Sequence, residues 1–130
     1  MVDDNDPVDW RKLREFAGVS LTRSYVLSWH AERDALVIDI DLLLEPEHPF
    51  YEAPRPAEKV CIRPACIEFP YCERLAAGAA AGGPAQIAST IPGGIIEDFR
   101  VLADGHYEMR GDFGNVSIRS ERPILRLKGV

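Results

Sequence analysis

One histidine stands in a sequence setting that could support chemistry. His48 follows Glu47 in a proline-rich segment, residues 45–58, and Phe50 and Tyr51 come soon after it. A histidine with an acid and aromatic rings nearby can act as a general base or help to line a ligand pocket. The sequence provides no serine or cysteine nucleophile at a motif spacing and no HExxH pattern. We therefore predict no catalytic residue and treat the segment as a candidate binding site.

Two carboxylates recur at the two-residue period of a β-strand. Asp39 and Asp41 should point to the same side of that strand, about 7 Å apart. Paired acid–base catalysis would require one of the two carboxyl groups to be desolvated. Acids that alternate with leucines more often mark a solvated sheet face, where they can pair with Arg119 or Arg126 on a neighbouring strand. We therefore expect a structural role for both carboxylates.

Cys61, Cys66 and Cys72 are the three cysteines, separated by four and five residues. This spacing matches no zinc-binding pattern, and the scattered histidines add none, so we predict no metal and no cofactor. An odd number of cysteines fits a reducing compartment, where we expect thiols that pack as small hydrophobic groups. One alternative stays open: if residues 63–64 bend a hairpin, Cys61 and Cys66 fall opposite each other and could form a disulfide.

The chain is acidic and has the length of one domain, so we expect a single domain over residues 1–130, which includes an acidic tail at residues 1–5. The chain holds 21 Asp and Glu against 15 Lys and Arg, a formal net charge of −6, which disfavours a nucleic-acid binder. The start is acidic where a secretory signal is basic and then apolar. No apolar run approaches the length of a membrane span. We therefore expect a cytoplasmic protein with no membrane partner, and the arginine-rich, alanine-rich composition suggests a bacterial source.

A short helix is predicted at the start of the domain. Asp6 can cap it, Pro7 suits its first position, and apolar side chains recur at helical spacing. The pattern predicts an amphipathic helix over residues 6–17 whose Trp10 and Phe16 pack against a sheet.

The rest of the chain has the two-residue period of β-strands, interrupted by two segments of different composition. The proline-rich residues 45–58 predict a loop, and the Ala/Gly-rich residues 76–83 predict a mobile connection. Together the elements predict an α+β, mainly β fold: a bent antiparallel sheet or β-sandwich of about seven strands with one N-terminal helix packed on it. The expected strands lie in a hairpin between residues 21 and 44, in a second hairpin at 59–63 and 65–69 bent at Pro64, and at 95–101, 106–110, 116–119 and 124–127.

Charge is distributed unevenly along the chain. The first nine residues carry four aspartates and no basic residue, whereas residues 110–130 carry five basic residues against two acidic ones. The two ends could dock on each other, either within one chain or between two copies, so the sequence permits a homodimer.

Four segments of the chain occur in an order that is known from other proteins. They are 24–29 (SYVLSW), 36–40 (LVIDI), 66–69 (CIEF) and the ending from Gly105 to Ile118. This arrangement resembles small β-rich bacterial proteins, some of which are grouped with the immunity proteins of polymorphic toxin systems. The likeness covers most of residues 10–128, although Arg23-Ser24 stands where those proteins often have His-Asp. It implies no catalytic residues.

Two functions from different classes are compatible with these observations. The first is a non-enzymatic, immunity-like protein-interaction module that uses its acidic surface and the 45–58 loop against a protein partner. The alternative is a small-molecule-binding or enzymatic β-fold with a pocket under that loop, lined by Trp29, His48, Phe50 and Tyr51. A deep apolar pocket with converging polar groups would favour the alternative. We expect the first, a protein that is not an enzyme.

Overall fold

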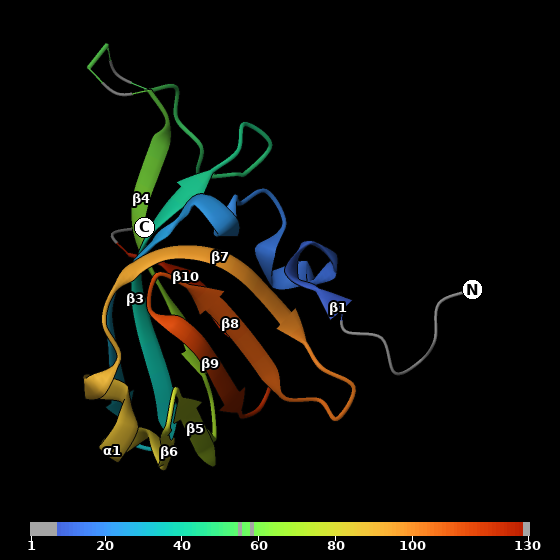
Figure 1. The fold of residues 1–130 in the computed structure, drawn as a ribbon. Helices are drawn as coiled ribbons and strands as arrows, with labels where there is room; N and C mark the ends of the chain where they lie inside the picture. The colour runs from blue at the N-terminus through green and yellow to red at the C-terminus, as the bar shows by residue number, and fades with distance from the viewer. Residues whose placement is uncertain (1–7, 55, 58, 129–130) are drawn as a thin grey trace.

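Ten strands pair into one antiparallel sheet within residues 8–54, 56–57 and 59–128, the part of the chain that the computed structural model describes. The strand order across the sheet is β10-β4-β3-β2-β7-β8-β9-β5-β6, and β1 pairs with β7 (Figure 1). The mainly β, antiparallel prediction is confirmed, although the strands exceed seven and one curled sheet takes the place of a sandwich. The strands are β1 (Val8–Asp9), β2 (Tyr25–Glu32), β3 (Ala35–Leu44), β4 (Cys61–Phe69), β5 (Arg74–Ala77), β6 (Ala80–Gly82), β7 (Gly94–Val101), β8 (Tyr107–Gly111), β9 (Gly114–Arg119) and β10 (Ile124–Leu127).

The predicted N-terminal α-helix is wrong for the residues that the structure describes. After β1 the chain makes two single 3-10 turns, η1 (Trp10–Lys12) and η2 (Arg14–Phe16), and Leu13 between them is extended. Pairing of β1 with β7 holds Val8 and Asp9 in an extended conformation, so an α-helix cannot include them. Trp10 and Phe16 are nevertheless buried in the core, as the apolar spacing predicted. The expected cap, Asp6 and Pro7, lies outside the described residues.

Other helical segments in the described ranges are short. They are η3 (Leu21–Arg23), η4 (Ala88–Thr90) and α1 (Pro84–Ile87), the last being the one α-helix in the described part of the chain. No helix within those ranges is long and apolar enough to cross a membrane.

The long hairpin predicted between residues 21 and 44 is confirmed as β2 and β3. The leucines and isoleucines at alternate positions of β3 are buried, while Asp39 and Asp41 on the outer face are partly exposed. On β2 the register shifts between Val26 and Ser28. This β-bulge adds Leu27 as an extra residue and leaves its side chain exposed.

The second predicted hairpin is wrong because its two halves form one continuous strand, β4, between β3 and β10. Pro64 lies in the middle of β4 without reversing the chain. Its carbonyl accepts a hydrogen bond from the Lys128 amide at 2.9 Å, just past the end of β10. In an antiparallel strand the N–H and C=O of one residue point to the same side. The donor that proline lacks would therefore face the end of β10, where no ladder bond is required.

The Ala/Gly tract predicted as a mobile connection instead forms the hairpin β5–β6 at one edge of the sheet. The turn between Ala77 and Ala80 has two residues, and its Gly78 has a φ of +60°. Glycine adopts this left-handed conformation without steric cost, which suits a tight hairpin. In this fold the small residues allow an edge strand rather than a linker.

The sheet curls until strands that are not neighbours in it meet inside the core (Figure 1). Phe69 on β4 packs its ring edge against Phe99 on β7 and Tyr107 on β8, with centroid distances of 6.0 and 5.6 Å. Phe16 contacts Phe99 in the same manner at 5.6 Å and so closes one end of the core. The aromatic cluster therefore joins the N-terminal turns to both halves of the sheet.

The two halves of the sheet are joined at a narrow junction between β2 and β7. These strands pair at only two positions, Tyr25 with Ile95 and Val26 with Gly94. Glycines permit backbone approaches here that a side chain would block. A Cβ atom on Gly93 would lie 2.5 Å from the carbonyl oxygen of Val26.

Candidate functional site

The four residues predicted to line a pocket under the 45–58 loop do not share one site. Trp29 is buried in β2, where its Nε1 donates a hydrogen bond to the Pro92 carbonyl at 3.0 Å and its ring packs on Phe113. Trp29 pairs with Ile38, six residues before β3 ends at Leu44. At about 3.3 Å per residue, this places Trp29 roughly 20 Å along the strand from the start of the loop. Trp29 is therefore a core residue at the other end of the hairpin.

The three remaining residues lie together in the loop and stabilise its shape. The Phe50 amide donates a hydrogen bond to Nδ1 of His48 at 3.1 Å, and the two rings are 5.8 Å apart. The Tyr51 amide donates to the His48 carbonyl at 3.0 Å, and the Tyr51 side chain packs against the core. Burial lowers the pKa of His48, which favours the neutral ring that an Nδ1 acceptor requires. The binding role predicted for these residues stays a prediction.

The surface formed by the described residues has four marked hollows, and none of the four is lined by Trp29, His48, Phe50 or Tyr51, the residues of the pocket that the sequence suggested. The largest, with a volume of about 760 Å³, lies where the β2–β3 turn meets the end of β4. Four of its seven lining residues are charged, whereas small-molecule pockets are lined mainly by apolar side chains. Its charged residues are Glu32, Arg33, Asp34 and Glu68.

Asp39 is the centre of a polar cluster on the outer face of β2, β3 and β10. Its carboxylate accepts a hydrogen bond from Ser28 Oγ at 3.1 Å and lies 3.3 Å from His30 Nδ1 and 2.5 Å from Lys128 Nζ. In a serine nucleophile site the histidine stands between serine and acid. Here the acid takes the central position, so Ser28 has no base to activate it. The cluster has the residue types of a catalytic triad and the connectivity of an ion-pair network.

The expected partners of Asp39 are corrected by this arrangement. Its basic partner is Lys128, while Arg126 contacts Glu68 at 3.6 Å and Arg119 contacts Asp104 at 3.4 Å. The reason is register: β10 lies beside β4, so the residue just beyond its end reaches over to β3.

Replacing Asp39 by asparagine is expected to lower the free energy of unfolding by about 1 kcal/mol at pH 7. Burial alone would raise the pKa of Asp39, but hydrogen bonds from Lys128 and Ser28 and the charges of Lys128 and His30 outweigh it, so the pKa lies below 3.8. A carboxyl whose pKa falls on folding stabilises the native state above its unfolded pKa and loses that effect as the pH falls through the folded pKa.

The difference between Asp39→Asn and the wild type should therefore shrink between pH 5 and the acid limit of folding, measured by urea unfolding. Asp41→Asn is the matched control, because Asp41 lies on the same face and forms no ion pair within the described residues. An equal loss for both variants, or a loss independent of pH, would contradict the role assigned to Asp39.

The three cysteines are free thiols, and two of them have raised pKa values. Burial raises the pKa of the Cys66 thiol, and it raises the pKa of Cys72 to about 11. A thiol with a raised pKa holds little of the reactive thiolate at neutral pH. Cys61 and Cys66 occupy one strand, about 16 Å apart at strand rise, so the disulfide that a hairpin would have allowed is excluded.

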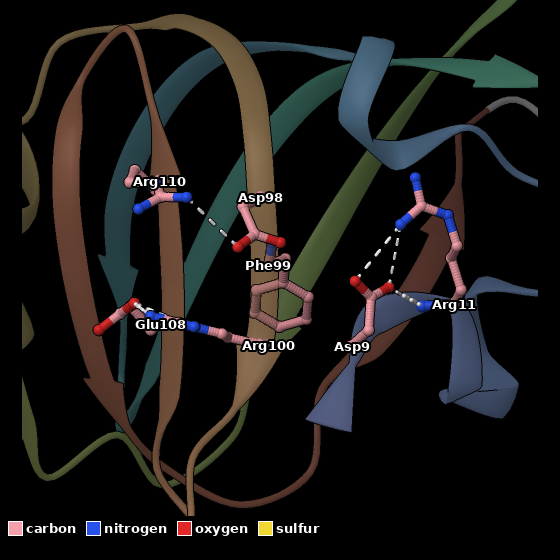
Figure 2. A network of polar contacts seen from close by, with 7 residues as sticks. All are labelled: Asp9, Arg11, Asp98, Phe99, Arg100, Glu108 and Arg110. Carbon is pink, nitrogen blue, oxygen red and sulfur yellow. Dashed lines mark hydrogen bonds and ion pairs between the residues drawn. The ribbon is translucent and has the colours of Figure 1, made fainter. Parts of the chain in front are cut away.

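The basic residues near the C-terminus have local acidic partners. Arg110 and Asp98, 3.6 Å apart, lie beside the Arg100–Glu108 pair on the outer face of β7 and β8 (Figure 2). Arg122 Nε donates to Glu15 at 2.5 Å and so links the final segment to the N-terminal turns. Of the acidic start, Asp9 pairs with Arg11 (Figure 2), and Asp3, Asp4 and Asp6 lie outside the described residues.

An exposed group of apolar side chains beside the junction of β2 and β7 was not predicted from the sequence. Tyr25, Leu27 and Ile95 are 44%, 52% and 38% exposed. Tyr25 and Ile95 are direct cross-strand partners, and Leu27 is the bulge residue of β2. We call these three residues the junction patch. Tyr25, Val26 and Leu27 alternate between the outside and the core, and the bulge then places Trp29 on the core side, opposite to Leu27.

Comparison of the chain with protein-family models, with curated proteins and with solved structures gives no match.

Proposed function

We propose that this protein is a non-enzymatic interaction module, of the immunity-like kind that the sequence resembles, and that its partner is a basic protein that docks on the junction patch. The observation that carries the proposal is the patch itself. Exposed aromatic and aliphatic side chains that lie together on a sheet face are typical of interaction sites. Isolated exposed apolar residues would not support it.

The surroundings of the junction patch favour a basic partner. Asp41 is the cross-strand neighbour of Tyr25, and Asp112 accepts a hydrogen bond from the Ile95 amide at 3.0 Å. These carboxylates lie at the rim of the apolar centre, in a chain whose net charge is −6. An acidic rim accelerates association with a basic protein and disfavours acidic competitors.

The 45–58 loop lies at the same end of the sheet as the junction patch. Asp41, the partner of Tyr25, comes three residues before the end of β3, about 10 Å along the strand from the loop. Phe50 on this loop is 48% exposed. The interaction surface expected from the sequence and the junction patch can therefore contact one partner together.

The alternative is a small-molecule-binding or enzymatic β-fold, and fewer observations favour it. It required a pocket under the loop, and none of the four hollows has the loop aromatics or Trp29 in its lining. The serine, histidine and acid that do meet on the outer face lack the order of a nucleophile site.

The proposal is tested with the protein encoded by the gene beside this one as the probe. Wild type should bind that protein and, if the protein is toxic, restore growth on co-expression. Leu27→Asp should weaken binding by about thirtyfold or more, because it places a charge in the apolar centre of the contact. Calorimetry at two salt concentrations measures the affinity and its ionic contribution. The affinity should fall with added salt, because salt screens the attraction between the charges.

Ile124→Asp is the control, since Ile124 is likewise an exposed aliphatic residue, at 38% against 52% for Leu27, but lies on the edge strand β10. It should leave the affinity unchanged. Equal affinity for Leu27→Asp and the wild type would refute the junction patch as the docking surface. Failure of the neighbouring protein to bind the wild type would remove the immunity-like assignment.

A further inference from the structure

We propose that the outer face of β5 and β9 holds a second site, which binds a single tetrahedral oxyanion of the phosphate class. The site is a small cavity of about 130 Å³. It is separate from the junction patch and does not depend on the proposed partner. Its lining consists of Arg74, Ala76, His106, Ser117 and Arg119.

The arrangement of the two arginines is the first argument for an anion. Arg74 and Arg119 are direct cross-strand partners on β5 and β9, and both side chains line the cavity. Like charges directly opposite each other destabilise a sheet. A bound anion between the guanidinium groups would remove the repulsion and use their planar donors, which match the oxygens of phosphate.

The local carboxylates do not satisfy this positive charge. Asp104 contacts Arg119 at 3.4 Å but also holds the His106 ring. Glu108, the cross-strand partner of Ser117, is engaged by Arg100 through two hydrogen bonds of 3.0 and 2.7 Å (Figure 2). Arg74 forms no ion pair with any carboxylate in the described part of the chain. Among the described residues, the charge of Arg74 beside the cavity is therefore uncompensated.

The size and the remaining lining limit the class of ligand. Pockets for drug-sized molecules measure about 300–1,000 Å³, so this cavity suits one small group rather than a nucleotide. Ser117 supplies a hydroxyl, His106 supplies a ring N–H, and Ala76 leaves the space open because its side chain is only a methyl group. Together these groups provide donors for a tetrahedral anion on more than one side.

The test is a titration of the whole chain with inorganic phosphate at constant ionic strength, followed by NMR amide shifts of β5 and β9. Saturable shifts are expected, with half-saturation on the order of 1 mM for a site with partly exposed arginines. A parallel titration with glycerol 3-phosphate distinguishes the source. Tighter binding of the ester indicates a small phosphorylated metabolite, and tighter binding of phosphate indicates the free ion.

Arg74→Gln should weaken binding about tenfold or more, because it removes a charged donor pair. In phosphate-free buffer the same variant should melt at a higher temperature than the wild type, because the cross-strand repulsion is gone. Arg110→Gln is the control, since Arg110 lies on the outer face of β8 and is already paired with Asp98. Phosphate binding should not change in that variant.

Ala76→Glu is a second test variant, and it keeps both arginines. Its carboxylate enters the cavity and should compete with phosphate, so the saturable shifts should disappear. The proposal is overturned if neither anion saturates the wild type by 50 mM, or if Arg74→Gln and Ala76→Glu both bind phosphate as the wild type does.

Discussion

Phe69→Ala is expected to lower the free energy of unfolding by about 3–5 kcal/mol, the range for removing a buried aromatic ring. Phe69 is fully buried and contacts both Phe99 and Tyr107. Through these two rings Phe69 connects β4 with β7 and β8 inside the curled sheet. The loss therefore includes the transfer of the ring to water, the cavity left behind and two aromatic contacts.

Urea unfolding followed by tryptophan fluorescence measures this effect, and Phe50→Ala is the matched control. Phe50 is the same residue type at 48% exposure, so its removal should change stability by less than about 0.5 kcal/mol. If the two variants were equally stable, the aromatic cluster would not be the centre of the core.

Gly111→Ala is expected to cost about 3 kcal/mol, through steric overlap rather than loss of contacts. A Cβ atom on Gly111 would lie 2.1 Å from the carbonyl oxygen of Ile95 and 2.9 Å from the Phe113 ring. The carbonyl is backbone at the start of β7, so relief would require the strand itself to move. That movement would strain the two-position pairing of β2 with β7.

The control for this variant is Gly83→Ala. No atom lies within 4 Å of a Cβ at Gly83, which also has an ordinary negative φ of −71°. Its stability should stay within about 0.5 kcal/mol of the wild type. Thermal and urea unfolding of both variants together separate the close approach at Gly111 from the general effect of replacing glycine on the unfolded chain.

Local patterns predicted the strands well where burial is one-sided. The alternation along β3 and the turns around β8 and β9 were enough, because a register error would expose an entire row of apolar side chains. The helix predicted for the N-terminal segment is wrong because isolated short helices are marginally stable. Pairing of Val8 and Asp9 with β7 favours the extended conformation instead. The predictions for Pro64 and for the Ala/Gly tract were wrong because their positions, opposite the end of β10 and at a sheet edge, depend on partners far along the chain.

The functional features were harder to predict for the same reason. The loop residues His48 and Phe50 do lie together, since they are neighbours in the sequence, whereas Trp29 belongs to the other end of the hairpin. Arg74 and Arg119 become neighbours only through the pairing of β5 with β9. A bulge of one extra residue puts Leu27 and Trp29 on opposite sides of β2, where a regular strand would keep them on one side. Neither feature leaves a local signal that composition or periodicity could reveal.

The strand order also determines how the chain must reach this structure. Besides the local hairpins, the sheet requires β2 to pair with β7 and β4 to pair with β10. In both pairs the two strands are far apart in the sequence. Closing such long loops costs chain entropy before any contact compensates it. Domains dominated by such pairings fold in milliseconds to seconds rather than microseconds. Since the two halves of the sheet can pair internally before they join, we expect the narrow junction of β2 and β7 to form late in folding.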